Sequence, residues 1–167
     1  IINLNWGDGM KGDLDFPKAQ VKEAWDRFVT TGEVDKCIRP WVAQSWVRCL
    51  ELGLDPKMLN KTAVVEKLDL QRRIIQNKDL LAVALPIMTE LQTFVKGSEF
   101  LTLITDCDGV MLEMLSDVGL RDAGQERNLS TGGIWNEEQA GTSAIGLAIR
   151  LAQPVQIVGA EHYYESD

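Results

Sequence analysis

The sequence predicts an α+β fold in which a small antiparallel sheet follows an N-terminal helical region. Apolar residues first recur at the helical period of about 3.6, and from Glu99 onward the period changes to two. Between two alternating runs, Asp106 to Gly109 supplies the polar, glycine-ended sequence that is typical of a hairpin turn. Helices before a hairpin, with one more helix after it, give the α+β pattern.

The helical part begins after a Gly- and Asp-rich arm, residues 1–17. Residues 18–31 carry apolar side chains at helical spacing, and Gly32 is a plausible stop. A second helix is predicted over residues 34–52. Pro40 lies inside it and either kinks the helix or marks its true start near Trp41.

A long helical pattern then covers residues 64–95, with Pro86 inside it. Residues 100–105 and 110–115 follow as two strands. Asn136 has the position of an N-cap for a helix that continues to about residue 152, and residues 154–160 are predicted to form a third strand. Because three strands make a small sheet, we expect this sheet to be incomplete in the chain and the natural polypeptide to continue.

The composition suits a globular domain and excludes several functions. The chain has 167 residues, 45% of them hydrophobic. Residues 99–167 hold three arginines against 12 acidic residues, a net charge of −9, which disfavours direct nucleic-acid binding there. Three cysteines without a CxxC pair, and no apolar run of about 20 residues, favour a protein of the reducing cytoplasm with no membrane span.

Three motif-like features carry no chemistry. The GxGxxG match at residues 7–12 has too few residues before it for the strand that a dinucleotide loop requires. Asp106 and Asp108 begin like a calcium loop but continue as a turn. The single histidine, His162, has only glutamates as nearby ligands of suitable type. We therefore expect neither a metal nor a cofactor.

Several segments resemble a known bacterial family. They are Ile38 to Pro56 (IRPWVAQSWVRCLELGLDP), Phe100 to Gly109 (FLTLITDCDG) and Trp135 to Gly146 (WNEEQAGTSAIG), followed by Pro154-Val155 and by Gly159 to Tyr163. Together they resemble the N-terminal GAF-type sensory region of sigma-54-dependent transcriptional activators similar to the acetoin-catabolism regulator. Ser143 stands where this family usually has Asn.

The resemblance implies a signal-sensing regulatory domain. It suggests an arm with helices over residues 1–63 and a GAF-like domain over residues 64–167. A small-molecule effector would control an AAA+ ATPase and a DNA-binding module, through which the protein would meet DNA and the sigma-54 RNA polymerase. The sequence contains neither GxxxxGK[ST] nor a basic helix pair, so we expect this chain alone to bind no duplex DNA and to hydrolyse no ATP.

An enzyme on a GAF-like scaffold is the alternative, for example a thiol-dependent methionine sulfoxide reductase. This chemistry needs an activated cysteine and a resolving partner. Cys37 and Cys49 lie roughly 18 Å apart if they share one helix, so they cannot pair with each other within the chain. We therefore favour a non-enzymatic role.

The predicted effector site lies around the helix that begins near Asn136. A GAF-type pocket would be lined by Trp135, Thr142, Ile145 and Gly146. Gly146 leaves a gap in the helix surface that either lets the backbone pack closely or gives room to a ligand. The acidic surroundings disfavour anions, so the expected effector is a small neutral metabolite.

A homodimer is the expected assembly. Apolar residues at intervals of seven in the long helix, with two tryptophans of the preceding helix, are typical of a helix–helix contact. The residues predicted to form the dimer contact are Leu70, Ile74, Leu81, Trp41 and Trp46. We expect the residues of the long helix before Pro86 to meet a partner chain and those after Pro86 to pack on the protein's own sheet.

Overall fold

The computed structural model describes residues 18–58, 61–98, 100–116 and 128–165. Packing within the chain forms two compact units. The sheet unit contains the described residues between 61 and 135. The helical unit contains those of 18–58 together with 136–165. The predicted division into domains at residue 63 stays a prediction, because these units are defined by packing alone.

The hairpin at the centre of the sheet unit consists of β1 (Leu101–Thr105) and β2 (Met111–Ser116). The strands are antiparallel, from Leu101 opposite Ser116 to Thr105 opposite Met111, with a bulge after Ile104. The Asp106 carboxylate accepts hydrogen bonds from the backbone N–H groups of Asp108 and Val110, at 3.0 and 2.9 Å. These bonds fix the turn that the sequence predicts.

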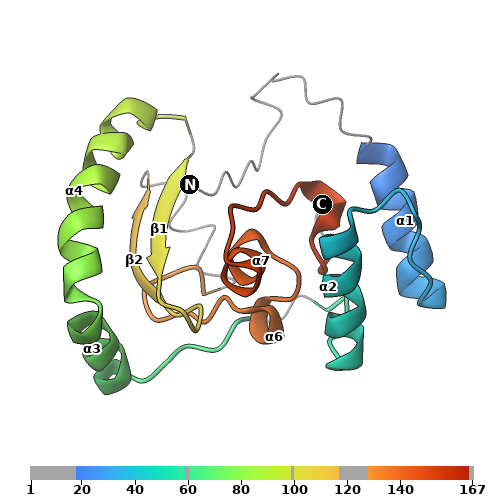
Figure 1. Cartoon of the computed structure of the whole chain (residues 1–167), viewed down its shortest axis with the longest axis horizontal. Helices are drawn as coiled ribbons and strands as arrows, with labels where there is room; N and C mark the ends of the chain where they lie inside the picture. Colours follow the sequence, from blue (N-terminus) through green and yellow to red (C-terminus); the bar gives the residue numbers. More distant parts are fainter. Residues whose placement is uncertain (1–17, 59–60, 99, 117–127, 166–167) are drawn as a thin grey trace. The chain divides into compact units, whose positions relative to one another are not determined.

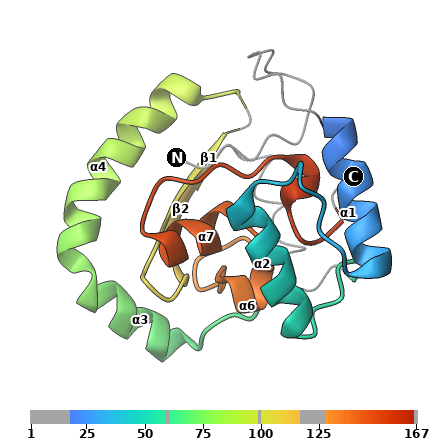
Figure 2. The same ribbon diagram turned by 45° about the vertical axis from the view of Figure 1, so that its right-hand side comes forward.

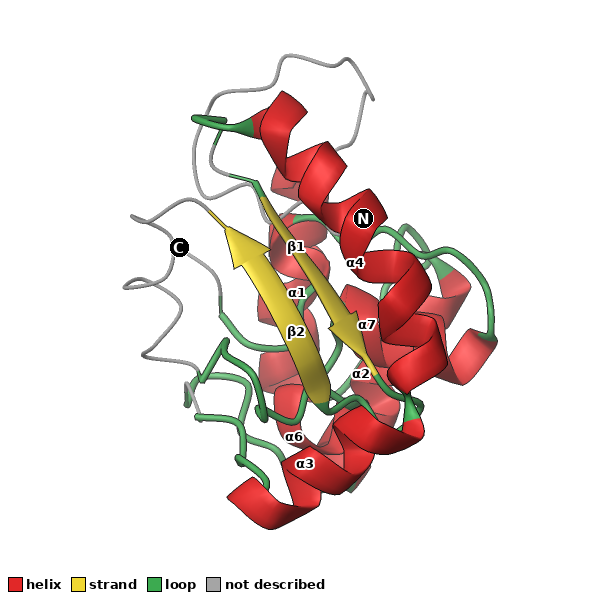
Figure 3. Ribbon diagram, turned by 90° about the vertical axis from the view of Figure 1, so that its left-hand side faces the viewer, coloured by secondary structure: helices red, strands yellow, loops and turns green. Residues whose placement is uncertain are grey.

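Two helices of the sheet unit lie along the hairpin, α3 (Lys67–Gln76) and α4 (Lys78–Val95) (Figures 1 and 3). The prediction of one helix over residues 64–95 was wrong. The break falls at Asn77, whose side-chain amide and backbone N–H both donate to the carbonyl of Arg73. Helix α4 instead continues through Pro86.

Arg73 ties α3 to the hairpin turn. Its guanidinium donates to Asp106 at 2.6 Å, to Asp108 at 2.8 Å and to Asp69 at 2.9 Å. These hydrogen bonds raise the pKa of the guanidinium above its usual value, with the bond to Asp108 contributing most. One guanidinium therefore bridges three carboxylates, of which Asp106 is nearly inaccessible to solvent.

The helical unit begins with α1 (Lys18–Thr31), which ends where Gly32 adopts a φ of +76°. Helix α2 (Pro40–Glu51) follows. Pro40 is the first residue of α2. Of the two interpretations of this proline, the one in which it marks the start of the helix is therefore confirmed. The apolar face of α1 buries Val21, Ala24, Trp25 and Phe28.

The helix predicted from Asn136 to residue 152 is two helices, α6 (Glu137–Ala140) and α7 (Ala144–Leu151). The predicted N-cap is confirmed, because Asn136 Oδ1 accepts from the backbone N–H of Gln139 at 3.1 Å. Gly141 then leaves the helical region with a φ of +62°. Ser143 caps α7 by accepting from the N–H of Gly146 at 3.2 Å. A second cap inside the apolar pattern is the reason for the break.

The third predicted strand is also wrong. Residues 154–158 carry no strand pairing, and the short 3₁₀ helix η1 (Gly159–Glu161) follows them. In Figure 2, η1 lies beside α1, and α6 lies beside α2. This segment packs on helices instead of joining a sheet.

The predicted α+β class, an antiparallel sheet preceded by a helical region, is confirmed. Among the described residues, the sheet has two strands. No helix in the described ranges is long and apolar enough to cross a membrane.

Replacing Arg73 tests the connection between α3 and the turn. Arg73→Met leaves the buried Asp106 carboxylate without its cation, so we expect the free energy of unfolding to fall by about 2–3 kcal/mol. Arg72→Met, at the exposed neighbouring position, is the matched control and should change stability by less than about 0.5 kcal/mol. Urea unfolding of both variants measures the difference, and equal losses would contradict the role of Arg73.

Candidate regulatory site

Helix α2 presents a row of side chains to the rest of the helical unit. Ser45, Trp46 and Cys49 are fully buried, and Arg48 is partly buried beside them. Their spacing of three and four residues places them on neighbouring turns of one face. This face meets α6 and the segment around η1.

Glu137, the first residue of α6, is held by the Arg48 guanidinium. Arg48 Nε donates to Glu137 Oε2 at 2.9 Å, and Arg48 Nη2 donates to Oε1 at 2.7 Å. The Arg150 guanidinium of α7 lies 3.6 Å from Oε2. The bidentate hydrogen bonding by Arg48 supplies donors to both oxygens of the Glu137 carboxylate, and this residue is only 7% exposed. It also raises the pKa of Arg48, chiefly through the hydrogen bond to Glu137.

Hydroxyl groups complete the same network. Ser45 Oγ donates to Glu137 Oε1, and it lies 2.7 Å from Thr142 Oγ1. Cys49 Sγ lies 3.7 Å from the Thr142 hydroxyl. Burial raises the pKa of the Cys49 thiol to about 11. The network is closed to solvent, since the exposed fractions of Ser45, Cys49 and Thr142 are at most 1%.

A second arginine–glutamate pair joins the start of α2 to η1. Arg39 Nε donates to Glu161 Oε1 at 2.6 Å, and Arg39 Nη2 donates to Oε2. The same guanidinium donates to the carbonyl of Gln156 at 2.6 Å. The Val158 N–H donates to Glu161 Oε2 at 3.0 Å. Glu161 is 1% exposed, so this carboxylate depends on protein donors for its solvation.

Aromatic side chains connect α1 to the same region. The indole N–H groups of Trp25 and Trp46 donate to the carbonyls of Tyr163 and Glu161, at 3.0 and 2.9 Å. The Tyr163 hydroxyl donates to the carbonyl of Leu54 at 2.7 Å. The Phe28 ring lies 5.2 Å from that of Trp46, measured between centroids. The two indole N–H groups and the Tyr163 hydroxyl therefore each have a hydrogen-bond acceptor.

The resembling segments around α2, α6 and η1 therefore meet in the helical unit, whereas residues 100–109 belong to the sheet unit. Sequence reasoning gives no role to Arg39, Arg48, Glu137 or Glu161, although all four lie inside those segments. Their partners are separated by 89 and 122 positions along the chain, so no local pattern reveals them. The resemblance itself was the available signal.

The predicted effector residues divide between the two units. Thr142, Ile145 and Gly146 lie in the helical unit and are buried. Trp135 lies in the sheet unit, where it packs against a cluster of Leu101, Met111 and Leu129. A Cβ at Gly146 would lie 2.9 Å from the backbone nitrogen of Glu137, so close packing occupies the gap. Ligand binding by these four residues stays a prediction.

The residues predicted for dimerisation lie at positions of different exposure. Leu70, Ile74 and Trp41 are half-buried, whereas Leu81 and Trp46 are buried in their own units. Leu81 belongs to the face of α4 that packs on the hairpin. A dimer through this set stays a prediction, although Trp46 offers no surface to a partner in this arrangement.

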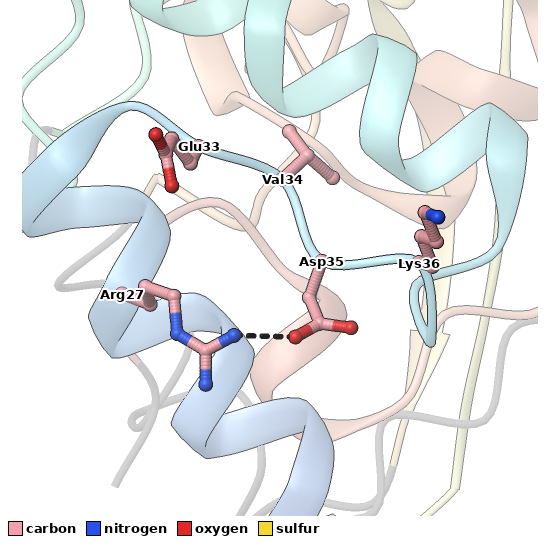
Figure 4. A pocket seen from close by; sticks show the side chains of 5 residues that line it. All are labelled: Arg27, Glu33, Val34, Asp35 and Lys36. Atoms are coloured by element: carbon pink, nitrogen blue, oxygen red, sulfur yellow. Dashed lines mark hydrogen bonds and ion pairs between the residues drawn. The ribbon is translucent and has the colours of Figure 1, made fainter.

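A shallow depression of about 290 Å³ lies at the end of α1 (Figure 4). It is lined by Arg27, Glu33, Val34, Asp35 and Lys36. Arg27 Nη1 lies 2.5 Å from Asp35 Oδ2, so its central charges neutralise each other. The backbone N–H of Cys37 also donates to Asp35, and this bond is the main cause of the lowered pKa of that carboxyl. Sequence reasoning did not predict this depression.

The three cysteines differ in exposure. Cys37 and Cys107 are exposed and Cys49 is buried, all three as free thiols. The pKa of Cys37 is raised, mainly by desolvation, as is that of Cys49. Both shifts oppose thiolate formation, which a reductase would need. Within the described residues, no group of three or more His, Cys, Asp or Glu side chains is arranged to hold a metal ion.

The geometry defines an α+β domain built around buried arginine–glutamate pairs, with its polar groups engaged in holding segments together. The chain belongs to the family of MimR N-terminal domains, whose description is "MimR, N-terminal domain" and which it matches over residues 17–166. The resemblance to regulators of transcription that the sequence predicts is thereby confirmed.

Three relatives of this chain are named as transcriptional regulators. It is 31% identical over 142 residues to the "Acetoin dehydrogenase operon transcriptional activator AcoR" of Bacillus subtilis, covering 84% of this chain and 24% of that protein. It is 30% identical over 127 residues to the "Acetoin catabolism regulatory protein" of Cupriavidus necator, covering 73% of this chain and 18% of that protein. The "Propane 2-monooxygenase operon transcriptional activator MimR" of Mycolicibacterium goodii is 26% identical over 144 residues, which cover 85% of this chain and 24% of the relative.

The chain spans about a quarter of these relatives or less. A solved structure shares the fold: a chain of the Escherichia coli DhaR(N)–DhaL complex, with a TM-score of 0.73 and 20% sequence identity. The match covers 76% of this chain and 43% of the other.

The buried thiol provides a test of the network around α2. Iodoacetamide at pH 8 should modify exposed Cys37 and Cys107 and leave Cys49 unmodified until urea unfolds the protein. Folding raises the pKa of the Cys49 thiol from 9.0 to about 11, so the protonated thiol favours the folded state. This contribution to the free energy of unfolding is complete below pH 9 and is lost as the pH rises towards 11. Mass spectrometry at each pH measures the labelling. Modification of Cys49 as fast as Cys107 in the folded protein would refute its burial.

Proposed function

We propose that the chain is the signal-sensing regulatory domain of a bacterial transcriptional activator. The observation that carries this proposal is the family match over residues 17–166, together with relatives named as transcriptional activators. The chain would act in the cytoplasm as part of a longer protein. In that protein, an AAA+ ATPase and a DNA-binding module would contact DNA and the sigma-54 RNA polymerase.

The proposed effector is a small neutral metabolite. Two relatives are named for acetoin and one for a propane monooxygenase, and acetoin and propane are both small and uncharged. The net charge of −9 in residues 99–167 supports this choice, because it disfavours anionic ligands. Acetoin is therefore the first compound to test.

The region of α6 and α7 is the proposed response element. Thr142, one of the residues predicted to contact the effector, shares a hydroxyl network with Ser45 and Glu137. An effector that displaced the Thr142 hydroxyl would disturb the carboxylate that Arg48 holds. Binding would then change how α2 is fixed to α6. Helix α2 would be the element that transmits the signal.

Effector-dependent transcription by the full-length activator tests this function. A reporter gene is measured against a concentration series of acetoin and of other small neutral ketones and alcohols. Thr142→Val removes the hydroxyl at nearly constant volume, and we expect it to shift the effector concentration at half-maximal transcription by about tenfold, equivalent to one hydrogen bond.

The matched control is Thr102→Val on β1. Thr102 is also buried, and its hydroxyl has no hydrogen-bond partner among the described residues. This variant should keep the wild-type response. Full effector response in an activator that lacks residues 17–166 would refute the sensing function. An unchanged response in Thr142→Val would refute the role of the hydroxyl network.

A further inference from the structure

Glu137 is approached by two arginines that come from two different helices. Arg48 of α2 donates to both carboxylate oxygens, at 2.9 and 2.7 Å. Arg150, in the last turn of α7, places its Nη1 atom 3.6 Å from Oε2. This distance is close enough for an ion pair but too long for a hydrogen bond. The two guanidinium groups therefore make unequal contacts with one carboxylate.

The oxygen that Arg150 approaches can accept one more hydrogen bond. Oε1 accepts from Arg48 Nη2 and from the Ser45 hydroxyl. Among the described residues, Oε2 accepts from Arg48 Nε alone. Because each carboxylate oxygen has two lone pairs, Oε2 keeps an unused acceptor position. Arg150 is the other cation within ion-pair range of this oxygen in the described part of the chain.

The packing of α7 explains why Arg150 reaches this carboxylate. Gly146 and Arg150 are four residues apart, so they lie on the same face of α7. A Cβ at Gly146 would lie 2.9 Å from the backbone nitrogen of Glu137 and 3.3 Å from its Cα. The glycine thus lets α7 pack directly on the first residue of α6. One turn later, Arg150 lies beside the side chain of the same residue.

The two arginines differ in their exposure to water. The side chain of Arg48 is 25% exposed, whereas that of Arg150 is 54% exposed. Arg150 can therefore approach or leave the carboxylate with little change in its hydration. Glu137 is buried and must keep a cation, because an unpaired buried carboxylate is strongly destabilising. If Glu137 leaves Arg48, Arg150 is thus the replacement that the structure offers.

Arg48 has a second acidic neighbour of its own. Glu51 follows three residues later on α2 and is exposed. The hydrogen bond to Glu137 is the main cause of the raised pKa of Arg48, and the charge of Glu51 also contributes. If Glu137 binds Arg150, Arg48 can therefore pair with Glu51. All four charges keep a partner in this second arrangement.

We propose that Glu137 exchanges between Arg48 and Arg150, so that its carboxylate connects α6 either to α2 or to α7. This inference rests on the proposed function, in which α6 and α7 respond to the effector and α2 transmits the signal. A shift of α7 by about 0.8 Å brings Arg150 to the distance of a charge-assisted hydrogen bond. The carboxylate then passes to Arg150, and α2 is released.

A mutational cycle on the two arginines of the 167-residue chain tests the exchange without an effector. In the wild-type background, Arg150→Met should raise the equilibrium constant of unfolding by less than about threefold, since Arg48 still holds Glu137. In the Arg48→Met background, the same change should raise it by about tenfold or more, because Glu137 loses its remaining cation. Arg72→Met removes another exposed arginine and is the matched control. Its effect should be equally small in both backgrounds.

Urea unfolding gives these equilibrium constants. Equal effects of Arg150→Met in the two backgrounds would overturn the exchange. If Arg48→Met does not fold, Arg48→Lys takes its place, because lysine keeps the charge and loses the bidentate geometry. Arg150→Met should then have an effect about threefold larger than in the wild-type background, and equal effects would again overturn the proposal.

Side-chain NMR identifies the arginine that Glu137 binds. In wild-type protein, the hydrogen-bonded Nε–H of Arg48 should exchange slowly with water, and the guanidinium protons of Arg150 should exchange rapidly. In Arg48→Met, or in Arg48→Lys if that variant is used, exchange at Arg150 should slow by about tenfold. Equally rapid exchange at Arg150 in wild-type and variant protein would show that the carboxylate does not pass to it.

Transcription by the full-length activator connects the exchange to regulation. Arg48→Met mimics the state in which Glu137 has left α2, so it should raise transcription in the absence of effector by about threefold or more. Arg72→Met should leave this level unchanged. An unchanged level in a folded Arg48→Met activator would overturn the regulatory role of the exchange. The sensing function is decided separately, by the activator that lacks residues 17–166.

Discussion

The helical unit depends on the burial of two glutamate carboxylates. Removing a carboxylate from water costs several kcal/mol unless a cation and further donors take the place of its hydration. For Glu137, the cations are Arg48 and the nearby Arg150, and the Ser45 hydroxyl is a further donor. For Glu161, the cation is Arg39, and the backbone N–H of Val158 is the further donor. Both principal arginines flank or belong to α2. This helix therefore holds two segments that lie far from it in the sequence.

The same requirement explains how the polar residues near α2 are used. Ser45, Thr142 and the indole of Trp46 each satisfy a buried group of a neighbouring segment, so their chemistry serves packing. Gly146 is small because the backbone of Asn136 and Glu137 lies against it. Any movement of α6 or α7 would change these contacts, and the contacts connect both helices to α2.

Local patterns predicted much of the fold. Helix α1 with its glycine stop, the start of α2 at Pro40 and the turn at Asp106 follow from rules that operate within a few residues. The break at Asn77 and the division at Gly141 could not be predicted, because an apolar period continues across both. Residues 154–160 look like a strand in sequence, yet their place is fixed by Arg39, more than 110 positions earlier. The site likewise depends on distant pairs, which one sequence does not reveal.

A double-mutant cycle on Arg48 and Glu137 tests the central claim most directly. Arg48→Met, Glu137→Gln and the double variant are unfolded in urea and followed by tryptophan fluorescence, to which Trp25, Trp41 and Trp46 contribute from the helical unit and Trp135 from the sheet unit. If the pair holds α2 to α6, each single change destabilises the unit by about 3 kcal/mol, and the double variant shows a coupling of about 2 kcal/mol. Additive effects, with coupling below about 0.5 kcal/mol, would contradict the account.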